Sequence, residues 1–159
     1  MRDLETISLA LTAAETGHLV LSTLHTRSAA DTVSRVIDAF PTDQQSHVRN
    51  MIANSLEAVV CQQLVPRKRG GRVCATEVLL INFAVRNLIR ENKVFQIPSM
   101  MQTGTTAGMV TMEQSLLNLF RGGVITKDMV LKRSNDPSVL EKIEEIMAHE
   151  TARMRGRNR

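Results

Sequence analysis

Two histidines near the N-terminus are the first residues of this chain whose types and spacing could do chemistry. His18 and His25 stand on either side of a short run rich in Leu and Val, and Thr26 follows directly. The run predicts a buried strand of a parallel sheet over residues 18–24. Open α/β sheets bind ligands at the carboxyl ends of such strands, so His25 and Thr26 are candidate site residues. On spacing alone, two histidines with purely structural roles explain the run better.

A second candidate is a helical stretch with two arginines. Arg86 and Arg90 are four residues apart and therefore share one face of a helix, whereas Leu88 and Ile89 point elsewhere, toward the core. An ordinary amphipathic helix with a solvated basic side explains this pattern equally well.

Several common catalytic patterns are missing from the sequence. It contains neither a G-x-x-x-x-G-K-[ST] loop nor a G-x-G-x-x-G loop. Cys61 and Cys74 form no C-x-x-C pair, and the four histidines do not fall at metal-ligand spacing, so we expect no metal site. Local chemistry alone therefore assembles no complete active site.

The composition is that of a globular protein. Of 159 residues, 43% are hydrophobic and 23% charged, and 20 Lys and Arg stand against 16 Asp and Glu. Four of the arginines lie in the last seven residues, so the rest of the chain is electroneutral, which argues against a nucleic-acid binder. The sequence shows neither a signal peptide nor a membrane-spanning run, and we expect a cytoplasmic protein with both thiols reduced.

The hydrophobic periodicity changes once along the chain. Helices are predicted over residues 3–16, from Ser28 and from Thr42, with the strand at 18–24 between the first two. A β-hairpin follows over residues 59–65 and 73–81. From residue 82 the pattern is helical throughout, with segments near 83–92, 94–102, 112–121, 127–133 and 137–154. The fold class is therefore α/β with a mostly parallel sheet, followed by an all-α part.

Three stretches together resemble one known family. They are Met-Arg-Asp-Leu-Glu-Thr at residues 1–6, the histidine-bracketed segment at 16–26, and Ala-Val-Arg-Asn-Leu-Ile-Arg-Glu at 84–91. Over residues 1–135 the chain resembles the C-terminal part of the pilus-retraction ATPases in the type II/IV secretion ATPase superfamily. The first two stretches are typical of the superfamily, and the third is more specific to retraction motors. Extension ATPases of the superfamily usually carry a four-cysteine zinc element, which two unpaired cysteines argue against.

The resemblance implies a fold and an assembly. Residues 1–81 would be part of a RecA-like P-loop ATPase core, with a helix after the Walker B strand, the His box and a β-hairpin. Residues 82–135 would form the helical C-terminal subdomain, and 136–159 a helix with a basic tail. The family works as a hexameric ring with ATP and Mg²⁺ between subunits. The resemblance also implies a cytoplasmic motor at the inner-membrane base of the pilus, with the membrane platform protein as its partner.

The resemblance also assigns roles to residues. His25 and His18 would be the catalytic His-box residues near the γ-phosphate, a role that suits a strong donor that titrates near neutral pH. Support of the nucleotide site falls to Arg2, Asp3, Glu5 and Thr26. Coupling of hydrolysis to retraction falls to the motif formed by Arg86, Asn87, Leu88, Ile89, Arg90 and Glu91. Arg27 departs from the Asn or Thr that usually follows the His box.

The family's P-loop, Asp box, arginine fingers and Walker B glutamate would all lie upstream of Met1. We therefore expect that this chain alone cannot bind ATP and shows no turnover. A truncated gene product, a miscalled start or a fragment would each explain this. Two readings stay open: the C-terminal part of an ATP-driven retraction motor, and a non-catalytic module that binds or joins the rings of a full-length motor. Nucleic-acid binding, supported only by the arginine tail, ranks third.

Overall fold

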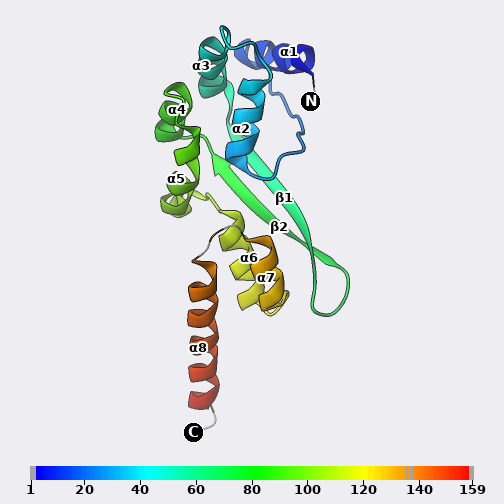
Figure 1. Ribbon diagram of the computed structural model, residues 1–159, viewed down its shortest axis with the longest axis vertical. Helices are drawn as coiled ribbons and strands as arrows, with labels where there is room; N and C mark the ends of the chain where they lie inside the picture. The colour runs from blue at the N-terminus through cyan, green and yellow to red at the C-terminus, as the bar shows by residue number, and fades with distance from the viewer. Residues whose placement is uncertain (1–2, 135, 137, 158–159) are drawn as a thin grey trace. The chain divides into compact units, whose positions relative to one another are not determined.

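The computed structural model describes residues 3–134, 136 and 138–157 (Figure 1). Helices dominate, and one β-hairpin interrupts them. In chain order the elements are α1 (Leu4–Glu15), α2 (Ala29–Asp38), α3 (Gln45–Ser55), β1 (Ala58–Pro66), β2 (Arg72–Leu80), α4 (Phe83–Arg90), the 3₁₀ turn η1 (Val94–Gln96), α5 (Ile97–Thr103), the 3₁₀ turn η2 (Thr105–Ala107), α6 (Met112–Arg121), α7 (Lys127–Arg133) and α8 (Val139–Arg157). The helices and the hairpin expected from hydrophobic periodicity are therefore present, with ends shifted by a few residues.

The chain divides into two compact units. Unit 1 comprises Met1–Cys61 and Glu77–Thr111, and unit 2 comprises Gln62–Thr76 and Met112–Arg159. The hairpin contributes its open end to unit 1 and its turn to unit 2. This division differs from a boundary at residue 82, because α4 and α5 pack with α2 and α3 in unit 1.

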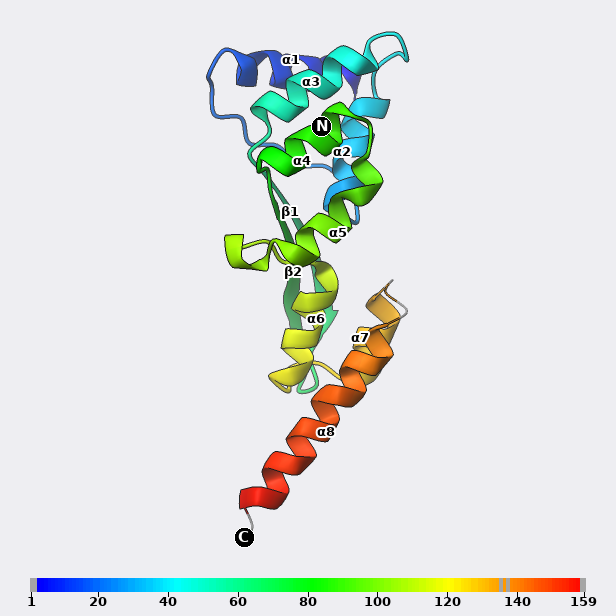
Figure 2. The ribbon, with the colours of Figure 1, turned by 90° about the vertical axis from the view of Figure 1, so that its left-hand side faces the viewer.

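Unit 1 has a core built from one apolar face of each helix. Val33 and Ile37 of α2, Ile52 of α3, and Val85 and Ile89 of α4 are all buried. Their spacing of three or four residues places each set on one helix face. Helix α3 lies beside both α1 and α4 (Figures 1 and 2).

Unit 2 has a separate buried cluster. Leu116 of α6, Val130 of α7 and Ile143 of α8 pack there with Val65 of β1 and Ala75 of β2. The two strands alternate buried and exposed residues, as a sheet with one covered face requires. Their turn closes with a hydrogen bond from Arg67 N to Gly71 O at 3.1 Å.

The buried strand expected over residues 18–24 is wrong. This segment has no regular secondary structure, and Leu19 and Leu21 are 86% and 87% exposed. A parallel strand needs hydrogen-bonding partners on its edges. Among the described residues, β1 and β2 pair with each other, and the isolated bridge of Val78 pairs with Val110, not with residues 18–24.

Two helix starts also differ from expectation. Helix α3 begins at Gln45 rather than Thr42, and its N-cap residue Gln44 makes no side-chain capping bond. Helix α8 begins at Val139, whereas the expected first residue, Pro137, lies outside the described residues. Within the described residues, no helix is both long and apolar enough to cross a membrane.

Candidate functional site

A cleft of about 540 Å³ in unit 1 brings together part of the candidate site. The segment before α2 contributes His25, Thr26 and Arg27 to its wall, and α1 contributes Ile7. Both His25 and Arg27 are exposed. The carboxyl end of the apolar run therefore lines a cleft, although the run itself is no strand.

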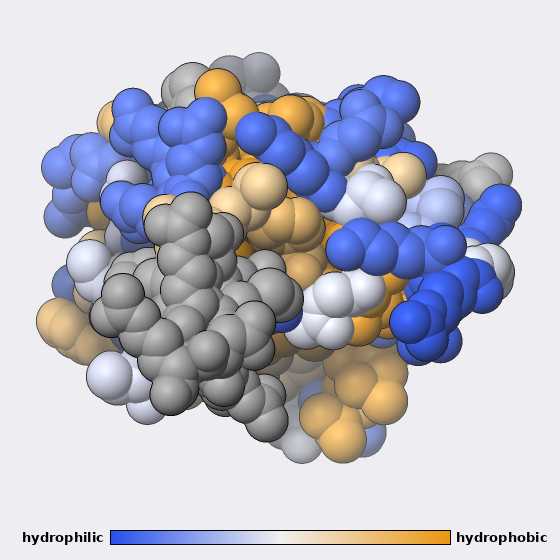
Figure 3. Space-filling view, turned by 90° about the horizontal axis from the view of Figure 1, so that it is seen from below, coloured by the Kyte–Doolittle hydropathy of each residue, from blue (hydrophilic) through white to orange (hydrophobic). Residues whose placement is uncertain are grey.

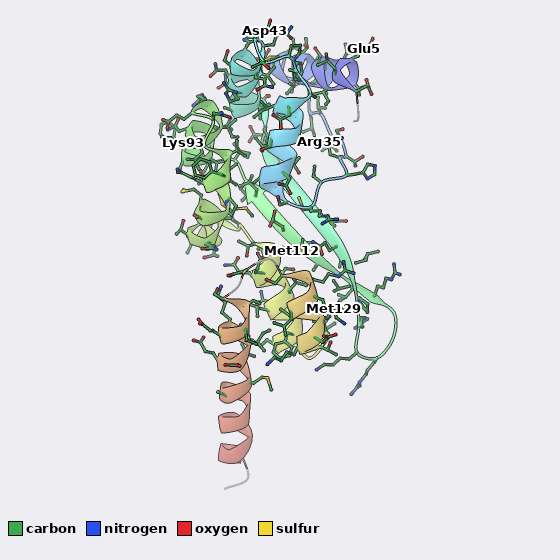
Figure 4. The ribbon with its side chains drawn as sticks, in the orientation of Figure 1. Glu5, Arg35, Asp43, Lys93, Met112 and Met129 are labelled. Carbon is green, nitrogen blue, oxygen red and sulfur yellow. The ribbon has the colours of Figure 1, made fainter. Side chains whose placement is uncertain are left out.

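Helix α2 supplies the other polar side of the cleft. Asp31, Arg35 and Asp38 line it (Figure 4 labels Arg35). Positions 31, 35 and 38 share one helix face, opposite the buried Val33 and Ile37. The same periodicity that buries one face of α2 therefore turns its charged face into the cleft.

Thr26 is fixed by a short chain of hydrogen bonds. Its Oγ1 lies 2.6 Å from Thr32 Oγ1, and Thr32 donates its own proton to Ser28 O at 2.8 Å. Thr26 must therefore be the donor to Thr32. The Sγ of Cys61 lies 3.9 Å from the same Thr32 hydroxyl. Burial raises the pKa of the Cys61 thiol, which keeps it protonated at neutral pH.

The start of α2 is held by a buried carboxylate from the hairpin. Ala29 N donates to Glu77 Oε1 at 2.6 Å, and Glu77 of β2 is only 8% exposed. A negative charge at a helix N-terminus is favourable because it meets free N–H groups and the positive end of the helix dipole. Glu77 therefore ties the hairpin to the segment that carries His25 and Thr26.

The cleft's donor set suits an anionic ligand. Two guanidinium groups and an imidazole are side chains that proteins use for phosphate oxygens, whereas the single hydroxyl proton of Thr26 is already donated to Thr32. The carboxylates of Asp31 and Asp38 line the same cleft and limit its net positive charge. No group of three or more His, Cys, Asp or Glu suited to a metal was found among the described residues. The residues present thus fit a phosphate contact, not a complete magnesium site.

Three other predicted site residues, His18, Asp3 and Glu5, are not among the residues that line the cleft. His18 is exposed, and its Nδ1 lies 3.1 Å from Thr16 Oγ1. Asp3 caps α1, accepting from Thr6 N at 2.9 Å and Thr6 Oγ1 at 2.6 Å, and these hydrogen bonds lower its pKa. Glu5 is exposed on α1 (Figure 4), and Arg2 lies outside the described residues.

The arginines of α4 form a clamp on α3. Arg86 Nη1 donates to the carbonyls of Ala53 and Asn54, the latter at 2.8 Å, and Arg86 Nη2 reaches Glu57 Oε1 at 3.2 Å. Arg90 Nη2 donates to Asn54 Oδ1 at 2.7 Å. The last carbonyls of a helix receive no hydrogen bond from within it, and Arg86 donates to two of those of α3, whereas Arg90 binds the Asn54 side chain. Arg86 is thus largely withdrawn from solvent, whereas Arg90 stays exposed, as the solvated basic side considered for this helix requires.

The remaining motif residues support the same helix. Ile89 is buried in the core of unit 1, and Leu88 is partly buried against that core. Asn87 Oδ1 accepts from Arg90 Nη1 at 3.2 Å. Glu91 pairs with Lys93 at 2.7 Å on the surface.

Comparisons with known proteins find similarity to secretion and pilus proteins. The family described as type II/IV secretion system protein matches residues 1–70. A twitching motility protein of Neisseria gonorrhoeae is 54% identical over 137 residues, which are 86% of this chain and 37% of that protein. The type IV pilus retractation ATPase PilT of Pseudomonas aeruginosa is 50% identical over 86% of this chain and 40% of its own length.

A solved structure shows the same similarity at the level of the fold. A crystal structure of the pilus retraction motor PilT with bound ADP superposes with a TM-score of 0.79 and 48% identity, covering 89% of this chain and 40% of that one. The chain is therefore similar to the type II/IV secretion family over residues 1–70 and to the C-terminal portion of the pilus retraction ATPases, of whose length it spans about two fifths.

Sequence reasoning missed several residues that line the cleft. Asp31, Arg35 and Asp38 could have been found, because they occupy the face of α2 opposite its apolar stripe. Glu77 also carried a signal, since it is in phase with the buried Ala75 and Leu79 of the same strand. A charged residue on the buried face of a strand needs a partner, and here that partner is the N-terminus of α2.

Proposed function

We propose that this chain supplies the nucleotide-sensing and coupling parts of a hexameric, ATP-driven motor that retracts type IV pili. The observation that carries the proposal is the cleft lined by His25, Thr26, Arg27 and Arg35, in a chain 54% identical to a twitching motility protein. The motor would act in the cytoplasm at the inner-membrane base of the pilus, with the membrane platform protein as its partner. ATP supplies the phosphoanhydride bond whose hydrolysis drives the motor.

The residues of this chain have distinct parts in the proposal. His25 donates a hydrogen bond to a phosphate oxygen, with Arg27 and Arg35 as neighbouring cations in the cleft wall. Movement of the His25 segment reaches β2 through the bond between Ala29 and Glu77. The clamp of Arg86 and Arg90 on α3 carries such a shift to α4. His18, Asp3, Glu5 and Arg2 act in support of the site.

A chimera tests the proposal. This chain replaces the matching 137-residue segment of the gonococcal twitching motility protein, and phosphate release is measured on the purified ring. We expect ATP hydrolysis by the chimera and a roughly 100-fold loss in its His25→Ala variant, as for removal of one donor to a developing oxyanion. His47→Ala removes an exposed histidine outside the cleft and is the matched control. A chimera that assembles but hydrolyses no ATP contradicts the proposal.

The exposed apolar segment favours a second candidate, a non-catalytic module that binds a full-length motor. Leu19 and Leu21 are more than four-fifths exposed, and burying them against a partner would be favourable. The gonococcal protein mixed with this chain should then co-elute with it in size-exclusion chromatography. Changing both leucines to Ser should abolish co-elution, whereas Leu9→Ser, at a leucine 65% exposed on α1, should not. Separate elution of the two wild-type proteins rules this candidate out.

A further inference from the structure

The turn of the hairpin concentrates positive charge in unit 2. Arg67, Lys68, Arg69 and Arg72 lie within six residues, and all four are exposed. No acidic residue occurs between Gln62 and Thr76, the hairpin segment of this unit. None of the four forms an ion pair with another residue in the part of the chain that the structure describes. This cluster, the basic turn, therefore keeps its full charge toward solvent.

The basic residues of the chain are also concentrated in unit 2. Unit 2 holds 13 Lys and Arg against 7 Asp and Glu, whereas unit 1 holds 7 against 9. The electroneutral body inferred from composition thus hides a basic unit and a slightly acidic one. An anionic partner would be attracted to unit 2.

The basic turn is anchored rather than loose. Gly70 and Gly71 adopt φ values of 82° and 73°, which close the turn. Lys68 N donates to Val124 O at 2.9 Å, in the loop that follows α6. The Lys68 ammonium lies 6.0 Å from the ring centroid of Phe120, at the end of α6. Arg121, the next residue, is exposed and adds a fifth cation to this region.

An apolar side chain accompanies the cations. Leu64 lies two residues before Pro66 at the end of β1 and is 59% exposed. On the face seen from below, orange hydrophobic residues lie between blue hydrophilic ones (Figure 3). Basic side chains beside an exposed leucine are the combination that binds the headgroup region of an anionic bilayer.

We propose that the basic turn, with Leu64, docks unit 2 on an anionic phospholipid surface. A nucleic acid fits less well, because residues 62–76 offer no aromatic side chain on which a base could stack. A turn at the end of a hairpin also presents its cations to a flat charged surface and forms no groove along a phosphate backbone. The inference rests on unit 2 and holds whether or not the chain serves a pilus motor.

Vesicle co-sedimentation tests the proposal. The chain is mixed with vesicles of phosphatidylcholine alone or with 30% phosphatidylglycerol, at low and high salt. We expect binding only to the anionic vesicles, weakened as salt rises. Replacing Arg67, Lys68, Arg69 and Arg72 by Gln should lower the partition coefficient by roughly 100-fold or more, since each basic residue contributes several-fold. Leu64→Ser should lower it further at high salt, where the electrostatic part is screened.

The arginine tail provides a control of equal charge. Replacing Arg153, Arg155, Arg157 and Arg159 by Gln removes the same four charges but should leave most of the binding. Circular dichroism of each variant checks that the fold is kept. The proposal is overturned if wild-type chain does not bind anionic vesicles, if it binds neutral vesicles equally, or if the tail variant alone loses binding. Tighter, turn-dependent binding to duplex DNA than to vesicles would assign the turn to nucleic acid instead.

Discussion

At the scale of single residues, the arginine clamp is the clearest case of a motif whose role depends on distant partners. Arg86 is 22% exposed and donates to two carbonyls near the end of α3. We expect Arg86→Ala to lower the free energy of unfolding by about 2 kcal/mol, because charged hydrogen bonds are lost and the carbonyl of the buried Ala53 is left without this donor. Chemical denaturation measures the change.

The matched control removes a surface cation nearby. Lys93 pairs with Glu91, and both side chains are about half exposed. Lys93→Ala should therefore cost less than about 1 kcal/mol. An equal loss in both variants would mean that Arg86 acts only as a surface charge.

Asp136 makes the stability of the fold depend on pH. The hydrogen bond from Lys142, followed by those from Ser138, lowers the pKa of Asp136 from 3.8 to about 2. Because the folded pKa is depressed, the stabilisation is present above about pH 4 and is lost as the pH falls toward 2. Asp136→Asn should lower the melting temperature at pH 6. It should also reduce the further fall in melting temperature between about pH 4 and 2, because the variant has no carboxylate to protonate there.

The comparison is a series of thermal melts from pH 7 to 2. Asp128→Asn, which breaks the exposed ion pair with Lys132, is the control because its carboxylate has no comparable set of donors. If Asp136→Asn and wild type lose stability in parallel between pH 4 and 2, the proposed linkage is wrong.

Only part of the candidate site could be predicted from the sequence. His25 and Thr26 line the cleft as expected, but the strand end from which they were predicted is absent, and spacing alone had favoured structural roles. The acceptors of Arg86 were not predictable, because they lie 29 to 33 residues earlier in the chain and only packing brings α3 against α4. Periodicity identifies a face of a helix but not what covers it.

At the scale of elements, sequence patterns predicted correctly those elements whose backbone hydrogen bonds form within the element itself. Helices α1, α2 and α4 begin at side-chain caps from Asp3, Ser28 and Asn82, and their hydrogen bonds are internal. The hairpin likewise pairs with itself. Residues 18–24 carry an equally clear strand pattern, but a parallel strand depends on neighbours that the described chain does not offer. The same composition therefore yields an exposed, irregular segment.

The N-cap residue Asn82 stabilises the start of α4. Asn82 Oδ1 accepts from Val85 N at 3.0 Å and satisfies one of the four free N–H groups at the start of the helix. Asn82→Ala should cost about 1 kcal/mol in free energy of unfolding, and Asn82→Asp, which keeps an acceptor, should cost much less. Urea denaturation of both variants measures the difference. Equal losses would show that the cap does not hold α4.

At the scale of the whole molecule, the chain has two buried clusters rather than one core. Residues of unit 1 gather around α2, α3 and α4, and residues of unit 2 around α6, α7 and α8. The hairpin is shared, with Leu79 in the first cluster and Ala75 in the second. Each unit therefore has its own hydrophobic stabilisation, which predicts that the units lose structure separately.

A cavity in one cluster tests this separation. Leu116 is fully buried in unit 2, and Leu116→Ala should cost about 2–5 kcal/mol there. Hydrogen exchange should then show faster exchange of amides in α6 and α7, with α3 and α4 unchanged. Ile52→Ala in unit 1 should give the reverse pattern, since Ile52 is buried between the helices of that unit. If either substitution speeds exchange equally in all four helices, the two clusters unfold as one cooperative structure and the division into two units has no energetic basis.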